Sequence, residues 1–246
     1  MKMAIQQDQS MIRNFVPLYV KQYMESQVLG QYVVGLTGGI ACGKSYVGRK
    51  FVEIGNAKGI NVHNIELDYV GHQILSELME PLYVETRKQI TETFGQEVRL
   101  EDGTIDRKEL GAKVFGNNDE MDKLNEIMLN PLLIRTKQEM YGKKGLILIN
   151  AALTAEFDMG YLSNNNVVMV YADKPTQTSR LASRGLTPEE MQRRLDSQLG
   201  FHNKMTKLEE AIERDKHGKI WVLDNSKSAN EIEAVFDKVV SELKVK

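Results

Sequence analysis

One octapeptide constrains the fold of this chain more than any other feature. Residues 38–45 read GGIACGKS and satisfy the pattern G-x-x-x-x-G-K-S. A short apolar run, residues 33–36, precedes the octapeptide, and residues 46–51 continue it with a helical pattern. Between a strand and a helix, such glycines let successive backbone N–H groups turn inward around a phosphate at the positive end of the helix. The sequence therefore predicts a phosphate loop that binds a nucleoside triphosphate.

The residues of this loop have distinct expected roles. The Lys44 ammonium is expected to reach the β and γ phosphates of ATP, and the Ser45 hydroxyl to take one position on Mg²⁺. Cys42 allows two interpretations: a thiol with a lowered pKa that serves as a redox or alkylation site, or simply a small side chain where a small one fits. The residues of the loop expected to bind the nucleotide are Gly38, Gly39, Ala41, Cys42, Gly43, Lys44, Ser45 and Tyr46.

Two carboxylates follow the next apolar run, residues 60–65. Glu66 and Asp68 are two residues apart, so an extended chain places their side chains on the same side. A phosphotransferase has to accept a proton from the attacking hydroxyl, and it often supplies one more oxygen ligand to Mg²⁺. We therefore expect Asp68 to be the general base and Glu66 to hold the metal together with Ser45. Without the phosphate loop, the same pair would indicate a helix cap and a surface charge.

Short apolar runs alternate with helical stretches along the rest of the chain. Strands separated by helices predict an α/β fold, a three-layer sandwich in which helices cover both faces of a five-stranded parallel sheet. Residues 69–144 are predicted to be a helical insertion, in which Asp106 and Glu109 have the spacing of a capping box. Asn164–Asn166 reads as a polar turn. The predicted strands are residues 33–36, 60–67, 146–151, 167–171 and 220–223.

The first 31 residues form a leader before the phosphate-loop domain. Apolar residues such as Ile12, Phe15 and Tyr19 recur at three- and four-residue steps, which predicts an amphipathic helix. We expect this helix to pack on the domain; a dimer contact and a loose tail are the alternatives.

Composition excludes several classes of protein. The 32 basic and 34 acidic residues leave a net charge of -2, which argues against disorder and against a broadly basic surface for nucleic acid. No apolar run approaches the roughly 18 to 20 residues of a membrane span. The single cysteine excludes an intrachain disulfide framework. We expect a cytoplasmic protein that binds neither nucleic acid nor membrane and is a monomer or a homo-oligomer.

Taken together, these motifs resemble the dephospho-coenzyme A kinase family, P-loop enzymes that use ATP to phosphorylate the ribose 3′-hydroxyl of dephospho-coenzyme A in the last step of coenzyme A biosynthesis. The resemblance covers about residues 32–240. It rests on the sequences LTGGI at 36–40, ELD at 66–68, DGTIDR at 102–107 and DNS at 224–226. It implies a P-loop kinase domain over residues 32–246 after the leader 1–31, with an acceptor-binding helical insertion at about 75–143 and a lid at about 178–205.

The resemblance also implies further site residues. Arg180 and Arg184 would be catalytic residues of the lid, and Asn225 would contact the nucleotide; ATP, Mg²⁺ and dephospho-coenzyme A would be the ligands. Arg193 and Arg194 add to the same basic cluster. Guanidinium groups suit transferring phosphates because they offer planar, paired donors, although a solvated helix face would carry arginines too.

Some residues depart from the family pattern, and they fall on the acceptor side. Asn130–Pro131 stands where the family usually has histidine–proline, and Ala152 stands where it has proline. Two other functions therefore stay open: a P-loop kinase for another small acceptor, such as a nucleotide or nucleoside, and a catalytically weak nucleotide-binding protein.

Overall fold

The computed structural model describes residues 16–185, 187–196, 198–226 and 230–246. Ile12 and Phe15 of the predicted leader helix lie outside the described residues. The chain forms two compact units: the larger comprises Met1–Asn64 with Gly142–Lys246, and the smaller comprises Ile65–Tyr141. The phosphate-loop sequence lies in the larger unit.

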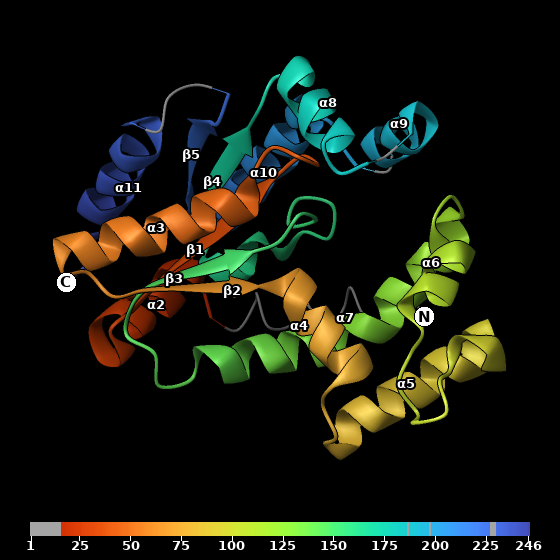
Figure 1. The fold of residues 1–246 in the computed structure, drawn as a ribbon. Coiled ribbons are helices and arrows are strands. Elements are labelled where there is room, and N and C mark those ends of the chain that lie inside the picture. Colours follow the sequence, from red (N-terminus) through yellow and green to blue (C-terminus); the bar gives the residue numbers. More distant parts are fainter. Residues whose placement is uncertain (1–15, 186, 197, 227–229) are drawn as a thin grey trace. The chain divides into compact units, whose positions relative to one another are not determined.

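A five-stranded sheet with the strand order β2-β3-β1-β4-β5 forms the centre of the larger unit (Figure 1). β1 pairs in parallel with β3 and β4, and β4 pairs in parallel with β5. The predicted α/β fold with a five-stranded parallel sheet is therefore confirmed, and β1 delivers the phosphate loop to the middle of the sheet. The strands are β1 (Gln31–Gly38), β2 (Val62–Glu66), β3 (Gly145–Asn150), β4 (Asn166–Tyr171) and β5 (Lys219–Asp224).

Helices connect these strands. At the start of one of them, α9, Thr187 and Glu190 form a complete capping box: Glu190 N donates to Thr187 Oγ1, and Thr187 N donates to Glu190 Oε2. The helices of the larger unit are α2 (Leu18–Tyr23), the π-helix η1 (Met24–Leu29), α3 (Lys44–Lys58), the 3₁₀-helix η3 (Met159–Ser163), α8 (Lys174–Ala182), α9 (Pro188–Asp196), α10 (Phe201–Asp215) and α11 (Asn230–Leu243).

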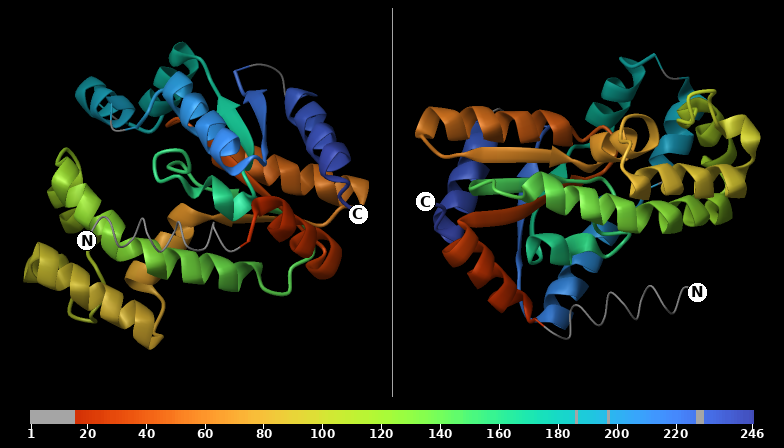
Figure 2. Two further views of the ribbon diagram at one scale, coloured as in Figure 1. Left: turned by 180° about the vertical axis from the view of Figure 1, so that it is seen from behind. Right: turned by 90° about the horizontal axis from the view of Figure 1, so that it is seen from below.

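Both faces of the sheet are covered, as its fully buried central strands require. On one face, Leu36 belongs to a cluster with Phe51 of α3 and Phe236 of α11, whose rings meet edge to face with 5.3 Å between centroids. On the other face, Met169 packs with Leu208 of α10. Figure 1 shows α3 in front of the sheet, and Figure 2 shows α10 on the opposite side. The predicted three-layer arrangement is thus confirmed.

The described part of the leader is anchored to the turn that precedes β4. Leu18 is buried, and Lys21 Nζ donates to Leu162 O at 3.1 Å and to Asn164 Oδ1 at 3.0 Å. Asn164 Nδ2 in turn donates to Glu25 Oε2 at 2.7 Å. Because Asn164 is fully buried, the asparagine run that the sequence presents as a plain polar turn is a polar anchor inside the unit. This part of the leader packs on the domain rather than trailing from it.

The smaller unit consists mainly of helices and has its own apolar core. Ile90, Val98 and Leu110 are among the buried residues of that core. Asp106 caps α6 by accepting hydrogen bonds from Lys108 N and Glu109 N, but Asp106 N donates to Val98 O, so the reciprocal half of the expected capping box does not form. Its helices are α4 (Leu67–Ser76), α5 (Pro81–Phe94), the 3₁₀-helix η2 (Gln96–Val98), α6 (Arg107–Val114) and α7 (Asn118–Met140).

Across the described ranges, every helix is too short or too polar to cross a membrane. The functional division into leader, insertion and lid stays a prediction.

The leader anchor predicts a stability effect. Replacing Lys21 by Met removes hydrogen bonds to Leu162 O and Asn164 Oδ1 and should lower the free energy of unfolding by about 1–2 kcal/mol in urea titrations. Lys88 makes only exposed ion pairs with Glu85 and Glu92, so Lys88→Met should change it by less than about 0.5 kcal/mol. Equal effects of the two substitutions would contradict the anchor.

Candidate functional site

The phosphate loop joins the end of β1 to the start of α3 through two glycines that tolerate no side chain. A Cβ on Gly38 would lie 2.2 Å from Val170 O of β4. Gly43, the residue before α3, has a φ of +93°, and a Cβ there would lie 2.3 Å from Asn225 Nδ2. Close packing and backbone conformation therefore explain why the pattern has glycine at these positions.

Lys44 is the first residue of α3, and its side chain lies back over the loop. Its Nζ donates to Gly38 O at 3.1 Å and to Gly39 O at 3.2 Å. The ammonium is thus already held at the helix N-terminus, where backbone N–H groups and the helix dipole favour an anion. A positive side chain and a positive helix end act on the same point.

Two side chains from distant parts of the sequence hold the outer surface of the loop. Arg180 of α8 donates through Nη1 to Ala41 O at 3.2 Å and to Cys42 O at 3.0 Å, and through Nη2 to Asn225 O at 2.8 Å. Asn225 Nδ2 donates to Cys42 O at 2.8 Å. We call Arg180 and Asn225 the loop brace. The resemblance implied a lid role for Arg180 and a nucleotide contact for Asn225. It did not indicate that both side chains bind carbonyl groups of the loop.

The remaining loop residues differ in exposure. Ala41 is buried and adopts a φ of +55°, which few non-glycine residues do. Ser45 is exposed in the first turn of α3. Tyr46 is 41% exposed, and Lys50 Nζ lies 5.7 Å from the centre of its ring. Ser45 thus lies at the surface of the helix end, beside the expected phosphate-binding backbone.

Cys42 is buried, and burial decides its chemistry. Desolvation raises the pKa of the thiol, although Lys44, Arg180 and Lys204 all act to lower it. The interpretation as a reactive thiol with a lowered pKa is therefore wrong. Cys42 belongs to the apolar cluster behind the loop, where a small side chain fits.

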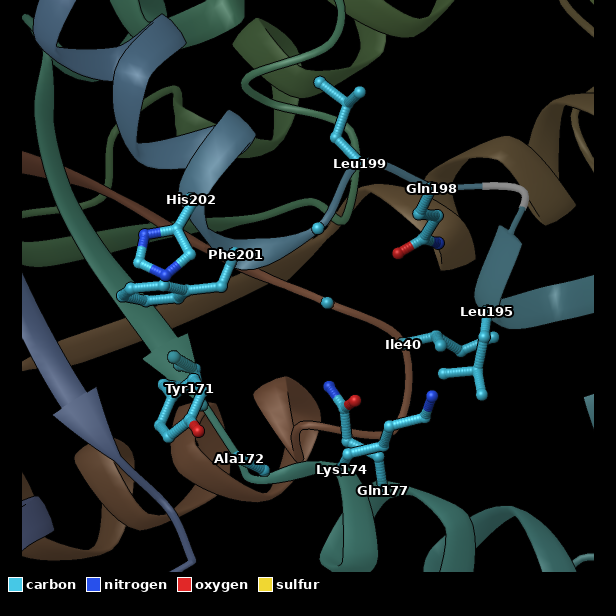
Figure 3. A pocket seen from close by; sticks show the side chains of 13 residues that line it. Ile40, Tyr171, Ala172, Lys174, Gln177, Leu195, Gln198, Leu199, Phe201 and His202 are labelled. Atoms are coloured by element: carbon cyan, nitrogen blue, oxygen red, sulfur yellow. The ribbon is translucent and has the colours of Figure 1, made fainter. Parts of the chain in front are cut away.

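A pocket of about 300 Å³ lies beside the leading edge of the loop, at Gly39 and Ile40. Figure 3 shows Gln177, Gln198 and Phe201 around it. Among the described residues, Gln198 Oε1 is buried without a hydrogen-bond partner. Amide groups and apolar side chains thus face one hollow directly next to the phosphate-binding backbone.

The structure does not bring all the predicted lid arginines to the loop. Arg184 follows the end of α8 and is exposed, whereas Arg180, one helical turn earlier, is in the loop brace. The side chains of Arg193 and Arg194 lie outside the part of the chain that the structure describes.

Glu66 and Asp68 lie where the second strand passes into α4. Glu66 is the last residue of β2 and occupies the N-cap position of α4, but its side chain makes no capping hydrogen bond there. Asp68 is exposed in the first turn of α4. The Asp68 carboxylate is therefore open to solvent and to a substrate.

The structure contains a buried ion pair, Lys204 with Glu156, that the sequence did not predict. Lys204 of α10 is fully buried, and its Nζ lies 2.5 Å from Glu156 Oε1. The two residues are 48 positions apart in the sequence, and nothing in the sequence signals that they pair.

Comparison with known proteins places these features in one family. The family model described as dephospho-CoA kinase matches residues 32–230. A dephospho-CoA kinase of Bacillus cereus is 35% identical over 188 residues, 74% of this chain and 88% of its own length. One of Dehalococcoides mccartyi is 37% identical over 173 residues, 68% of this chain and 80% of its own length. The crystal structure of TT1252 from Thermus thermophilus, 21% identical, shares the fold with a TM-score of 0.64 over 87% of this chain and 98% of its own.

The contact between Gly43 and the loop brace predicts a loss of nucleotide binding. In Gly43→Ala the new Cβ would meet Asn225 Nδ2 at 2.3 Å, so the Kd for ATP measured by calorimetry should rise about tenfold or more. Gly59 at the other end of α3 is a matched control, because its φ is +71° and nothing lies within 4 Å of an added Cβ. Gly59→Ala should destabilise the fold by about 1 kcal/mol and leave the Kd unchanged. Wild-type ATP affinity in Gly43→Ala would contradict the account.

Proposed function

Because the chain belongs to the dephospho-CoA kinase family, we propose that its phosphate loop holds ATP while Asp68 prepares the ribose 3′-hydroxyl of dephospho-CoA for attack. Family membership confirms the activity expected from the sequence: the chain is an ATP-dependent kinase of dephospho-CoA, which carries out the last step of coenzyme A biosynthesis. The roles of individual residues are proposals. The observation that carries them is the loop itself, with Lys44 held over its backbone at the start of α3.

Lys44 and the loop N–H groups bind the triphosphate. On binding, the ammonium exchanges the carbonyls of Gly38 and Gly39 for phosphate oxygens, which are better partners because they are charged. The loop brace keeps the carbonyls of Ala41 and Cys42 directed outward, so that the N–H groups stay directed at the phosphates. Charge that builds up on the transferring group is stabilised by donors already in place.

The oxygen donors of Ser45 and Glu66 fit Mg²⁺, which prefers hydroxyl, carboxylate and water oxygens. Ser45 lies in the first turn of α3, and Glu66 is the last residue of β2. When bound, the ion would neutralise phosphate charge. We propose these two residues as its protein ligands.

Asp68 is proposed as the general base. Its carboxylate accepts the proton of the 3′-hydroxyl as that oxygen forms a bond to the γ-phosphorus, and the bond from the γ-phosphorus to the bridging oxygen breaks to release ADP. The Asp68 carboxylate is exposed in the first turn of α4, where a substrate hydroxyl can reach it.

Arg180 and Arg184 are proposed as lid residues with different tasks. Arg180 is engaged with loop carbonyls and orders the binding site, whereas the exposed Arg184 is free to approach the transferring phosphate when the lid closes and excludes water. We place the reaction in the cytoplasm, consistent with the sequence.

The activity is tested by incubating the protein with Mg-ATP and dephospho-CoA and following the acceptor by mass spectrometry. We expect one added phosphate with the wild type and none with Lys44→Ala. Product from the Lys44→Ala protein would contradict the role of the loop. Phosphorylation of nucleosides or nucleotides in preference to dephospho-CoA would contradict the proposed acceptor.

The role of Asp68 predicts a selective loss of transfer. Asp68→Asn should keep the Kd for ATP and lower kcat by about 10²–10⁴-fold, the usual contribution of a general base. Asp119 also lies exposed in the first turn of a helix, α7, so Asp119→Asn is a matched control that should keep the wild-type kcat. Equal kcat values for Asp68→Asn and the wild type would rule out Asp68 as the base.

A further inference from the structure

The buried pair of Lys204 and Glu156 is not used by the proposed chemistry, yet it lies directly behind the site. Lys204 is in the first turn of α10 and has no exposed surface. Its Nζ donates to Ala152 O at 2.7 Å and to Glu156 Oε1 at 2.5 Å. Both partners lie in the segment that follows β3. The charged side chain of Lys204 thus links α10 to the segment that follows β3.

The same two partners connect the phosphate loop and the pocket wall. Ala152 O also accepts a hydrogen bond from Thr37 Oγ1 at 3.3 Å, and Thr37 directly precedes Gly38. Glu156 Oε1 also accepts from Leu199 N at 3.2 Å, and Leu199 lines the pocket just before α10. Lys204 and Glu156 therefore join the start of the loop to the segment between α9 and α10.

Stability alone does not account for this arrangement. Removing two charges from water is costly, and well-packed apolar residues of similar size often stabilise a protein as well or better. Within the described residues, Glu156 Oε2 is buried without a hydrogen-bond partner, which adds to the cost. The pair does provide fixed directions, because the ammonium binds two groups of the segment after β3 and the carboxylate binds two groups at and just before the start of α10.

We propose that Glu156 and Lys204 are positioning residues that set the pocket wall at Leu199 against the leading edge of the phosphate loop. The inference rests on the proposed function, since the wall and the loop line one pocket, where the transferring phosphate would lie. In the proposed function, Lys44 and the loop N–H groups bind ATP without help from the wall. A displaced wall should therefore slow transfer more than it weakens ATP binding, and a misplacement of about 1 Å can cost about 10²-fold in rate.

The test is a double substitution that removes both charges, Lys204→Met with Glu156→Leu. Each single substitution leaves one buried charge unpaired and should lower Tm by about 6–15 °C, whereas the double variant should return to within about 4 °C of the wild type. If the pair positions the wall, the double variant should still show kcat lowered by about 10- to 100-fold, with the Kd for ATP changed less than about threefold.

A second ion pair between the same two segments supplies the control. Arg214, also on α10, pairs with Asp158, which follows Glu156 by two residues, but both side chains are partly exposed. Arg214→Met with Asp158→Asn should leave kcat and the Kd for ATP at wild-type values, and asparagine tolerates the positive φ of Asp158. A fall in kcat equal to that of the first double variant would overturn the proposal.

Thr37→Val keeps the proposal falsifiable if the double variant does not fold. This substitution preserves shape and charge but removes the donor to Ala152 O, so kcat should fall about threefold or more while Tm falls by only about 2–4 °C. If the wild-type enzyme transfers phosphate, a wild-type kcat in Thr37→Val or in a folded double variant would overturn the positioning role. A wild-type protein that transfers nothing to dephospho-CoA would instead reject the function on which the inference rests.

Discussion

The site depends on how the chain satisfies the carbonyl groups of the phosphate loop. Turning several N–H groups toward a phosphate directs the carbonyls of the buried Ala41 and Cys42 away from it, and each carbonyl then needs another partner. Arg180 and Asn225 supply those partners with three hydrogen bonds from Arg180 and one from Asn225, including the bond that links the two residues. Without them, the anion-binding conformation would carry unsatisfied buried groups.

Because the loop carbonyls need these partners, the loop is hydrogen-bonded to residues that follow two other strands of the sheet. Arg180 comes from the helix after β4, and Asn225 follows β5, the two strands that lie successively beside β1 in the sheet. The parallel pairing of β1, β4 and β5 brings the residues after these strands to one edge of the sheet. The strand order thus assembles the brace from segments that are more than a hundred residues from the loop.

Much of this could be predicted from the sequence because the signals are local. The loop has a fixed spacing of Gly38, Gly43 and Lys44, the strands are apolar runs, and Thr187 with Glu190 marks a helix start. Contacts between distant residues could not be predicted. The raised pKa of Cys42 follows from burial that only the folded loop creates, and the asparagine at 164 looks like a turn residue until the leader packs against it. The pairing of Lys204 with Glu156 likewise depends on α10 crossing the segment after β3.

The central claim is that the loop is held in its binding conformation by hydrogen bonds to its outer carbonyls, and Arg180→Lys tests it most directly. Lysine keeps the charge but cannot serve three carbonyls in the planar geometry of a guanidinium. Calorimetric titration with ATP should give a Kd raised about tenfold, equivalent to about 1.4 kcal/mol, in a protein that still folds. An unchanged Kd would show that charge alone suffices and would contradict the account.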